Sequence, residues 1–174
     1  MVALGDGIYW DSCIFYALLK GEKHRDGELE AIKRQAKAFD EGNLYIITSS
    51  ITLTEVMPAK LEQAHQELFA GMHKRSTFVW VDANPKVTGL AVELRTKFVK
   101  TQPITGNNLW LSTPDAIHIA SAISVGVPEL ITLDGNDKPK LKETSMLEFS
   151  NEIEAQYGLK IMRPDTTGQI DLYE

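Results

Sequence analysis

The hydrophobic positions of the chain form two alternating patterns. Short apolar runs flanked by polar residues predict strands, whereas apolar residues at every third or fourth position predict amphipathic helices. The predicted strands are Ile8 to Trp10, Leu44 to Thr48, Thr77 to Val81, Glu129 to Leu133 and, near the end, Leu159 to Met162. The predicted helices lie at about residues 12–20, 29–39, 53–68, 87–98, 113–125 and 146–157.

The residues around two of these helices indicate how they begin and end. Thr113 is expected as the N-cap of one helix, with Pro114 at its first position, and Ser49 and Ser50 suit the N-cap of the helix at 53–68. Pro58 falls past the first turn of that helix and should kink it or split it in two. Its apolar face is expected to carry Leu53, Met57, Leu61, Ala64 and Leu68.

The alternation of strands and helices predicts an α/β fold. We expect a mostly parallel sheet of four or five strands, joined by right-handed crossovers and covered by helices on both faces. The 174 residues suit one domain, and no repeat or low-complexity linker divides them, so we expect a single domain over 1–174. Residues 101–112 contain a proline, a glycine and two asparagines and are predicted as a loop.

Composition and charge narrow the class of protein. No apolar stretch approaches the roughly 20 residues that span a bilayer, and the single cysteine, Cys13, cannot pair within the chain. We therefore expect a cytoplasmic protein with no membrane partner. The net charge of −6 argues against indiscriminate binding of nucleic acid through a basic surface, so a nucleic acid would have to be held in a local groove.

Four acidic residues lie where predicted strands end or helices begin. Asp11 follows the first strand and Asp134 the fourth, Glu55 opens the helix after the second strand, and Asp115 lies in the first turn of the helix before the fourth. Parallel sheets bind ligands outside the carboxyl ends of their strands, which places Asp11, Asp134 and Glu55 at one edge. The helix with Asp115 precedes a strand, and we expect a plain crossover to start that helix at the opposite edge.

Four carboxylates within one pocket would repel one another. At about 5 Å and an effective dielectric constant of about 20, each pair costs roughly 3 kcal/mol, so six pairs would rival the stability of a small domain. Such a set either takes up protons or holds hard divalent cations, and an all-oxygen set suits Mg²⁺ or Mn²⁺ rather than zinc. Plain structural roles also fit, since Asp115 suits any helix start and Asp134 suits a turn before Gly135.

Segments spread over nearly the whole chain resemble one protein family. They are Ile8-Tyr9-Trp10-Asp11-Ser12, Thr54-Glu55, Thr113-Pro114-Asp115-Ala116-Ile117-His118-Ile119-Ala120-Ser121-Ala122 and Leu130-Ile131-Thr132-Leu133-Asp134. In their order and spacing they resemble the PIN-domain nucleases, which include the toxin ribonucleases of the virulence-associated protein C (VapC) type. The resemblance implies a three-layer sandwich in which the helix with Asp115 does present this acid to the shared pocket.

The resemblance implies a ribonuclease that uses Mg²⁺ or Mn²⁺. Asp11, Asp115 and Asp134 would be metal ligands, and Glu55 would bind the metal through water or orient the attacking water. The groups expected to orient these carboxylates are Ser12, Thr113 and Thr132. A toxin of this type implies a small antitoxin partner, and the chain could form a homodimer. The alternatives are a non-catalytic or RNA-processing module on the same fold.

An aspartyl-phosphate phosphatase is a further alternative, because Asp11 ends a first strand. Those enzymes need a second aspartate two positions later, where this chain has Cys13, and this counts against them. A buried thiol is the expected role of Cys13.

RNA would be held mainly by its backbone. The candidate basic contacts are Lys33, Arg34, Lys37, Lys138, Lys140 and Lys142. Asp137 is either an additional outer acid at the metal site or a solvated turn residue. Trp110 either stacks on a base or packs under its loop, and His118 is either a partner of the acids or an interior histidine.

Overall fold

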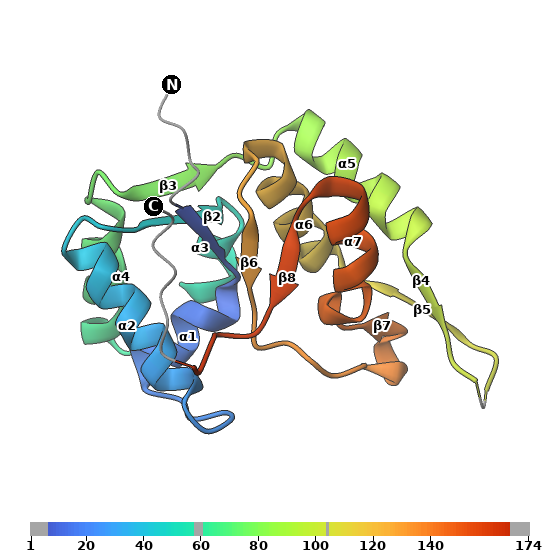
Figure 1. Cartoon of the computed structure of the whole chain (residues 1–174), viewed down its shortest axis with the longest axis horizontal. Helices are drawn as coiled ribbons and strands as arrows, with labels where there is room; N and C mark the ends of the chain where they lie inside the picture. Colours follow the sequence, from blue (N-terminus) through green and yellow to red (C-terminus); the bar gives the residue numbers. More distant parts are fainter. Residues whose placement is uncertain (1–6, 58–60, 104, 168–174) are drawn as a thin grey trace.

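The computed structural model describes residues 7–57, 61–103 and 105–167 (Figure 1). Five parallel strands form the central sheet in the order β3-β2-β1-β6-β8. Their bounds are β1 Gly7–Trp10, β2 Tyr45–Ser49, β3 Phe78–Val81, β6 Glu129–Ile131 and β8 Lys160–Met162. All five strands predicted from the sequence are therefore present, and the parallel sheet is confirmed.

Successive residues of each strand point to opposite faces of the sheet and enter two separate cores. Tyr9, Ile47 and Leu130 belong to one core, and their neighbours Trp10, Ile46 and Ile131 belong to the other. Because both faces are covered, the central residues of the strands are mostly apolar. The polar residues Ser49, Glu129 and Lys160 lie at strand ends. The helices on the first face are α5 Pro85–Lys97, α6 Thr113–Val125 and α7 Ser150–Tyr157. Those on the second face are α1 Ser12–Lys20, α2 Glu28–Asp40, α3 Thr52–Val56 and α4 Gln63–His73.

Residues 101–112 are not the predicted loop. β4 Val99–Thr101 and β5 Asn108–Leu111 form an antiparallel hairpin, which extends into a second sheet through β7 Glu143–Thr144. Only Leu109 and Leu111 of β5 are fully buried, so its apolar pattern is too short to stand out in the sequence. Pro103 and Gly106, which suggested a loop, lie in the turn between β4 and β5.

The helix predicted over 53–68 is divided into α3 and α4. Of the two effects expected of Pro58, a kink or a split, the structure has the split. Pro58 itself lies outside the described residues. The predicted apolar face is wrong in part. Leu61 is buried and Met57 packs against the core, but Leu53 is 39% exposed, Leu68 is 61% exposed and α4 buries Phe69 instead. One helical period cannot be carried across the break, since each helix turns its own face to the core.

Two predicted helix starts are also wrong. Ile51, not a serine, precedes α3, and Ser50 instead accepts a hydrogen bond from the backbone of Ala83. Ser112 caps α6 by accepting from the N–H of Asp115, which makes Thr113 the first helical residue. Either hydroxyl suits a cap in the sequence, and the backbone conformation selects Ser112. The predicted helix at 146–157 begins as a 3₁₀ turn, Met146–Phe149, before α7.

The expected direction of α6 is corrected by its connection to β6. Residues 126–128 join the end of α6 to the start of β6, so α6 runs back along the sheet and begins near the carboxyl ends of the strands. Figure 1 shows α5 leading to the β4–β5 hairpin, from which α6 returns beside it. A helix that precedes a parallel strand therefore places Asp115 at the same edge as Asp11. No helix within the described residues combines the length and apolarity needed to cross a membrane.

Candidate functional site

Asp11 is fixed at the carboxyl edge of the sheet by several hydrogen bonds. Its backbone N–H donates to the carbonyl of Ile131, which ties it to the neighbouring strand β6. One carboxylate oxygen accepts from the N–H of Ser12 at 2.7 Å, and the other accepts from Thr132 Oγ1 at 2.8 Å and Cys13 Sγ at 3.0 Å. The side chain is nearly buried, so its orientation is set before any ligand arrives. Thr132 contacts the carboxylate that the sequence expected it to orient.

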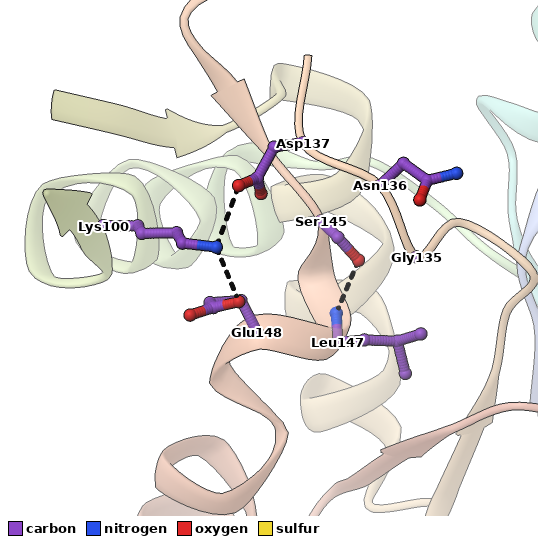
Figure 2. A pocket seen from close by; sticks show the side chains of 7 residues that line it. All are labelled: Lys100, Gly135, Asn136, Asp137, Ser145, Leu147 and Glu148. Carbon is purple, nitrogen blue, oxygen red and sulfur yellow. Dashed lines mark hydrogen bonds and ion pairs between the residues drawn. The ribbon is translucent and has the colours of Figure 1, made fainter. Parts of the chain in front are cut away.

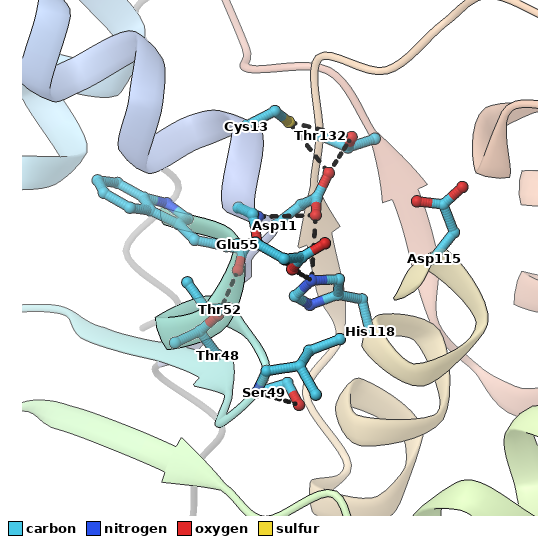
Figure 3. A network of polar contacts seen from close by, with 12 residues as sticks. Asp11, Cys13, Thr48, Ser49, Thr52, Glu55, Asp115, His118 and Thr132 are labelled. Atoms are coloured by element: carbon cyan, nitrogen blue, oxygen red, sulfur yellow. Dashed lines mark hydrogen bonds and ion pairs between the residues drawn. The ribbon is translucent and has the colours of Figure 1, made fainter. Parts of the chain in front are cut away.

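Glu55 is held beside Asp11 by groups from other elements. Its Oε2 accepts hydrogen bonds from Ser12 Oγ at 2.5 Å and from His118 Nε2 at 2.9 Å. Tyr16 donates its hydroxyl to the backbone carbonyl of Glu55 at 2.5 Å. Figure 3 shows Glu55, Asp11 and His118 pointing toward one another, with Asp115 at the side of this group.

His118 is the residue whose role the sequence left open, and it is both interior and a partner of the acids. Its side chain is fully buried, with Nε2 at 3.4 Å from Asp11 Oδ1 and Nδ1 at 2.8 Å from the Tyr9 hydroxyl. Burial by itself lowers the pKa of His118, but the hydrogen bond to Glu55 and the charges of the nearby acids outweigh burial and raise it. Its sequence signal was its position three residues after Asp115 on one helix face.

Asp115 lies half-buried in the first turn of α6, where the charges of other acids act on its carboxyl group. Burial, then the charge of Asp11 and then that of Asp134 raise its pKa to about 6, although Ser112 and Lys138 partly oppose this shift. The structure therefore brings Asp115 close enough to two other acids for repulsion to be felt. This is the electrostatic conflict that the sequence predicted.

Asp134 completes the acidic group, whereas Asp137 has other partners. The backbone N–H of Asp134 donates to Thr132 Oγ1, the hydroxyl that also binds Asp11, and its carboxylate lies 3.1 Å from Lys138 Nζ. Asp137 instead accepts from Lys100 Nζ at 2.8 Å and from Thr144 Oγ1 at 2.7 Å. The hydrogen bond from Lys100 lowers the pKa of Asp137.

Asp137 lines a polar pocket (Figure 2). Lys100 from β4 bridges Asp137 and Glu148 across it, so the pocket walls are tied together by an ion-pair network. Asp137 thus fastens the segment after Asp134 to the hairpin, and it is not the freely solvated turn residue that we considered.

Comparison with known proteins identifies the family. The PIN domain model matches residues 8–143. The chain belongs to the PIN domain family. No curated protein matches it.

Solved structures similar to this PIN domain come from toxin–antitoxin systems. One is VapBC2 from Rickettsia felis bound to a DNA fragment from its promoter, with a TM-score of 0.54 and 20% identity over 91% of this chain and 99% of that one. A toxin–antitoxin complex from Klebsiella pneumoniae has a TM-score of 0.46 and 26% identity, over 87% of this chain and 94% of that one. VapBC-5 from Mycobacterium tuberculosis has a TM-score of 0.46 and 14% identity, over 91% of this chain and 98% of that one. The first likeness confirms the predicted α/β fold.

The donor atoms of this PIN domain suit a hard divalent cation. Asp11, Glu55, Asp115 and Asp134 offer only carboxylate oxygens, and burial together with the charges of Asp11 and Asp134 raises the pKa of Asp115. Among the described residues, no three Asp, Glu, His or Cys side chains surround one point where they could together hold an ion. Mg²⁺ usually needs only one or two protein carboxylates and keeps several waters, so a looser set of acids is compatible with it.

The remaining predicted site residues divide into two groups. Thr113 is exposed at the start of α6. Ser112 has the capping role that was predicted for Thr113. On α2, Arg34 donates to the carbonyl of Asp165, Lys37 lies 3.7 Å from Glu41, and Lys33 is exposed.

The second group of lysines lies on the turn after Asp134, and Lys138 Nζ lies 3.1 Å from the Asp134 carboxylate. Lys138, Lys140 and Lys142 are exposed on the turn that follows Asp134. Trp110 on β5 is half-buried, and its backbone N–H donates to the backbone carbonyl of Lys142, so β5 lies beside this turn.

Proposed function

We propose that this PIN domain is a metal-dependent endoribonuclease and the toxin of a type II toxin–antitoxin pair. The observation that supports the proposal is the position of Asp115 in the first turn of α6, where burial and then the charges of Asp11 and Asp134 raise its pKa to about 6. A fold that gains nothing from this repulsion would be expected to avoid it. A cation that binds there offsets the repulsion and can accept a phosphate oxygen of the substrate.

In the proposed reaction, Asp11, Asp115 and Asp134 would hold Mg²⁺ or Mn²⁺. When bound, such an ion supplies hydroxide from water near neutral pH and offsets charge on the phosphoryl oxygens. Asp11 keeps one orientation because Thr132 and Cys13 donate to it. The two side-chain hydrogen bonds of Glu55 both reach Oε2, so Oε1 is the oxygen that can accept a hydrogen bond from the attacking water.

The turn after Asp134 is the proposed contact for the RNA backbone. Mutual backbone hydrogen bonds between Lys138 and Glu143 close this turn and present Lys140 and Lys142 to solvent. Lys138 reaches Asp134 itself, so a strand bound along the turn would lie next to the acids. On α2, Arg34 and Lys37 already have protein partners, and we assign the α2 residues Lys33, Arg34 and Lys37 a secondary role in RNA binding.

The partner we propose is a small antitoxin protein. Its support is the fold likeness to VapBC2 of Rickettsia felis, a structure that contains DNA from the promoter. Coexpression with the product of an adjacent reading frame tests this part separately. The partner should copurify with the chain and suppress its nuclease activity, and an isolated gene without such a neighbour would favour an RNA-processing role.

Cleavage of single-stranded RNA by the purified chain tests the enzyme itself. We expect activity with Mg²⁺ or Mn²⁺, none with EDTA, and loss of activity in Asp11→Ala. Asp26→Ala, which changes an exposed aspartate on the loop before α2, is the matched control. Equal cleavage by wild type and Asp11→Ala, or cleavage that persists in EDTA, would contradict the proposal. RNA binding without cleavage would favour the non-catalytic alternative, and release of phosphate from p-nitrophenyl phosphate would favour the phosphatase.

A further inference from the structure

Glu55 belongs to a helix that cannot orient it alone. The helix α3 has five residues and begins without a side-chain cap. Isolated helices of this length are unstable, because the cost of the first turn is not recovered by later hydrogen bonds. The side chain of Glu55 is also 29% exposed, so packing constrains it only in part. Its direction therefore depends on hydrogen bonds from neighbouring elements.

The imidazole of His118 supplies one of these bonds from the interior. An ionised carboxylate only accepts hydrogen bonds, so the Nε2 that lies 2.9 Å from Glu55 and 3.4 Å from Asp11 must carry the proton. In the neutral ring, Nδ1 then accepts from the Tyr9 hydroxyl at 2.8 Å. In the charged ring, Nε2 still donates to Glu55. The contact is thus the same in both protonation states.

Tyr9 holds this imidazole in place. The tyrosine is fully buried on β1, two residues before Asp11, and its ring meets that of His118 edge to face, with centroids 5.7 Å apart and an angle of 76°. A histidine held at Nδ1 and along its ring cannot turn Nε2 away from Glu55. The chain of contacts joins β1, α6 and α3. Asp11 directly follows β1, and α6 and α3 carry Asp115 and Glu55.

We infer that His118, supported by Tyr9, is a positioning residue that fixes the carboxylate of Glu55. The inference rests on the proposed nuclease function, and it assigns His118 no contact with RNA. Groups that orient a ligand from behind typically change activity or metal affinity by about 10–100-fold when they are removed. The same size of effect is expected here.

Substitutions that keep or remove the Nε2–H donor test the inference. In His118→Met the donor is lost at similar volume, and we expect kcat to fall about 10–100-fold with KM for RNA changed less than about threefold. His118→Gln places an amide N–H near the same point and should restore most of the activity. Tyr9→Phe should give a smaller loss, and His24→Gln, at an exposed histidine, should give none. Wild-type kcat in His118→Met would overturn the inference, as would failure of His118→Gln to restore activity in a folded protein.

A spectroscopic measurement decides the point without catalysis. ¹⁵N NMR of the side chain should show a proton on His118 Nε2, and Glu55→Gln should shift this resonance while the protein stays folded. If Glu55→Gln leaves the resonance in place, the contact is absent and the inference is wrong. Wild-type protein that cleaves no RNA would refute the proposed function alone, because this NMR result stands apart from activity. If His118→Met unfolds, His118→Gln and Tyr9→Phe carry the kinetic test.

Discussion

The acidic site has two halves that are stabilised in different ways. Asp11 and Glu55 are surrounded by hydrogen-bond donors, among them Thr132, Ser12 and the buried His118. Asp115 lies in the first turn of a helix, where burial and repulsion raise its pKa to about 6 despite the favourable helix dipole. The first half behaves as a prearranged frame, and the second carries charge that the protein itself does not neutralise.

This difference indicates where a cation is needed. Hydrogen bonds already compensate Asp11, so an ion would add less there than at Asp115, whose carboxylate is repelled by Asp11 and Asp134. The conflict at Asp115 is expected to reduce stability in return for binding, as is common at functional sites. The predictions below separate the two halves, beginning with the largest effect.

Activity should depend on both halves alike. Asp11→Asn and Asp115→Asn each keep the side-chain shape and remove the charge, so each should lower RNA cleavage by about 10²–10³-fold, the usual effect of losing one group that stabilises developing charge. Initial rates at saturating Mg²⁺ measure this effect, with Asp26→Asn as the control. A variant of either acid with nearly wild-type activity would remove that acid from the mechanism.

Stability should depend on pH through Asp115. Its carboxyl ionises near 3.8 when unfolded and at about 6 when folded, so the folded state binds the extra proton between these values. Ionisation of Asp115 should therefore lower stability by up to about 3 kcal/mol as pH rises from 4 to above 6, and this contribution should then level off. Urea unfolding in EDTA across this range measures it.

The matching control for this pH dependence is Asp115→Asn. Because His118 also has a raised pKa, it lowers stability further as pH rises above its usual value of 6.5, and only the fall below that pH that disappears in Asp115→Asn belongs to the carboxyl. An unchanged slope in this variant would contradict the assignment.

The two halves should respond oppositely in stability at pH 7. Asp11→Asn removes a buried carboxylate that satisfies Thr132 and Cys13, which should cost about 1–3 kcal/mol. Asp115→Asn relieves repulsion and should leave the protein as stable or more stable in EDTA. Free energies of unfolding from chemical denaturation compare them. Equal destabilisation by both variants would show that the halves are not different after all.

Asp137 should affect neither half strongly. Its partly exposed ion pair with Lys100 is of a kind worth about 0.2–1 kcal/mol, so Asp137→Asn should destabilise slightly and change RNA cleavage less than about twofold. Thermal unfolding and cleavage rates, with Lys100→Met as the paired variant, check this. A large loss of cleavage would return Asp137 to the metal site, as one reading of the sequence allowed.

Much of this fold could be predicted from the sequence because the sheet is buried on both faces. The run Ile8 to Trp10 is apolar throughout, and Leu130 and Ile131 form the apolar part of the run after Glu129, which marks both as strands. The hairpin at β5 could not be recognised, since only alternate residues such as Leu109 meet the core and its partner strand is polar. The pattern of apolar residues within β5 carries little information, because the hairpin is formed by backbone pairing between β4 and β5.

The acids of the candidate site, and Ser12 and Thr132 beside them, were predicted from the sequence, but most of the contacts that hold these acids were not. Strand ends place Asp11 and Asp134 at one edge by topology alone. The partner of Asp137 is Lys100, 37 residues away, and the bond from His118 to Glu55 spans 63 residues. Contacts this distant depend on how helices pack on the sheet, which no spacing in the sequence reports.

The central claim is that Asp115 and its neighbouring acids form a site that a divalent cation stabilises. The most direct test is thermal unfolding at pH 7 with increasing Mn²⁺, because an ion at about 100 times its Kd adds about 2.7 kcal/mol to a folded protein that binds it. The account predicts that Mn²⁺ raises the Tm of the wild type and has little effect on Asp115→Asn. A wild-type Tm that does not change with Mn²⁺, or an equal rise in Asp115→Asn, would contradict it.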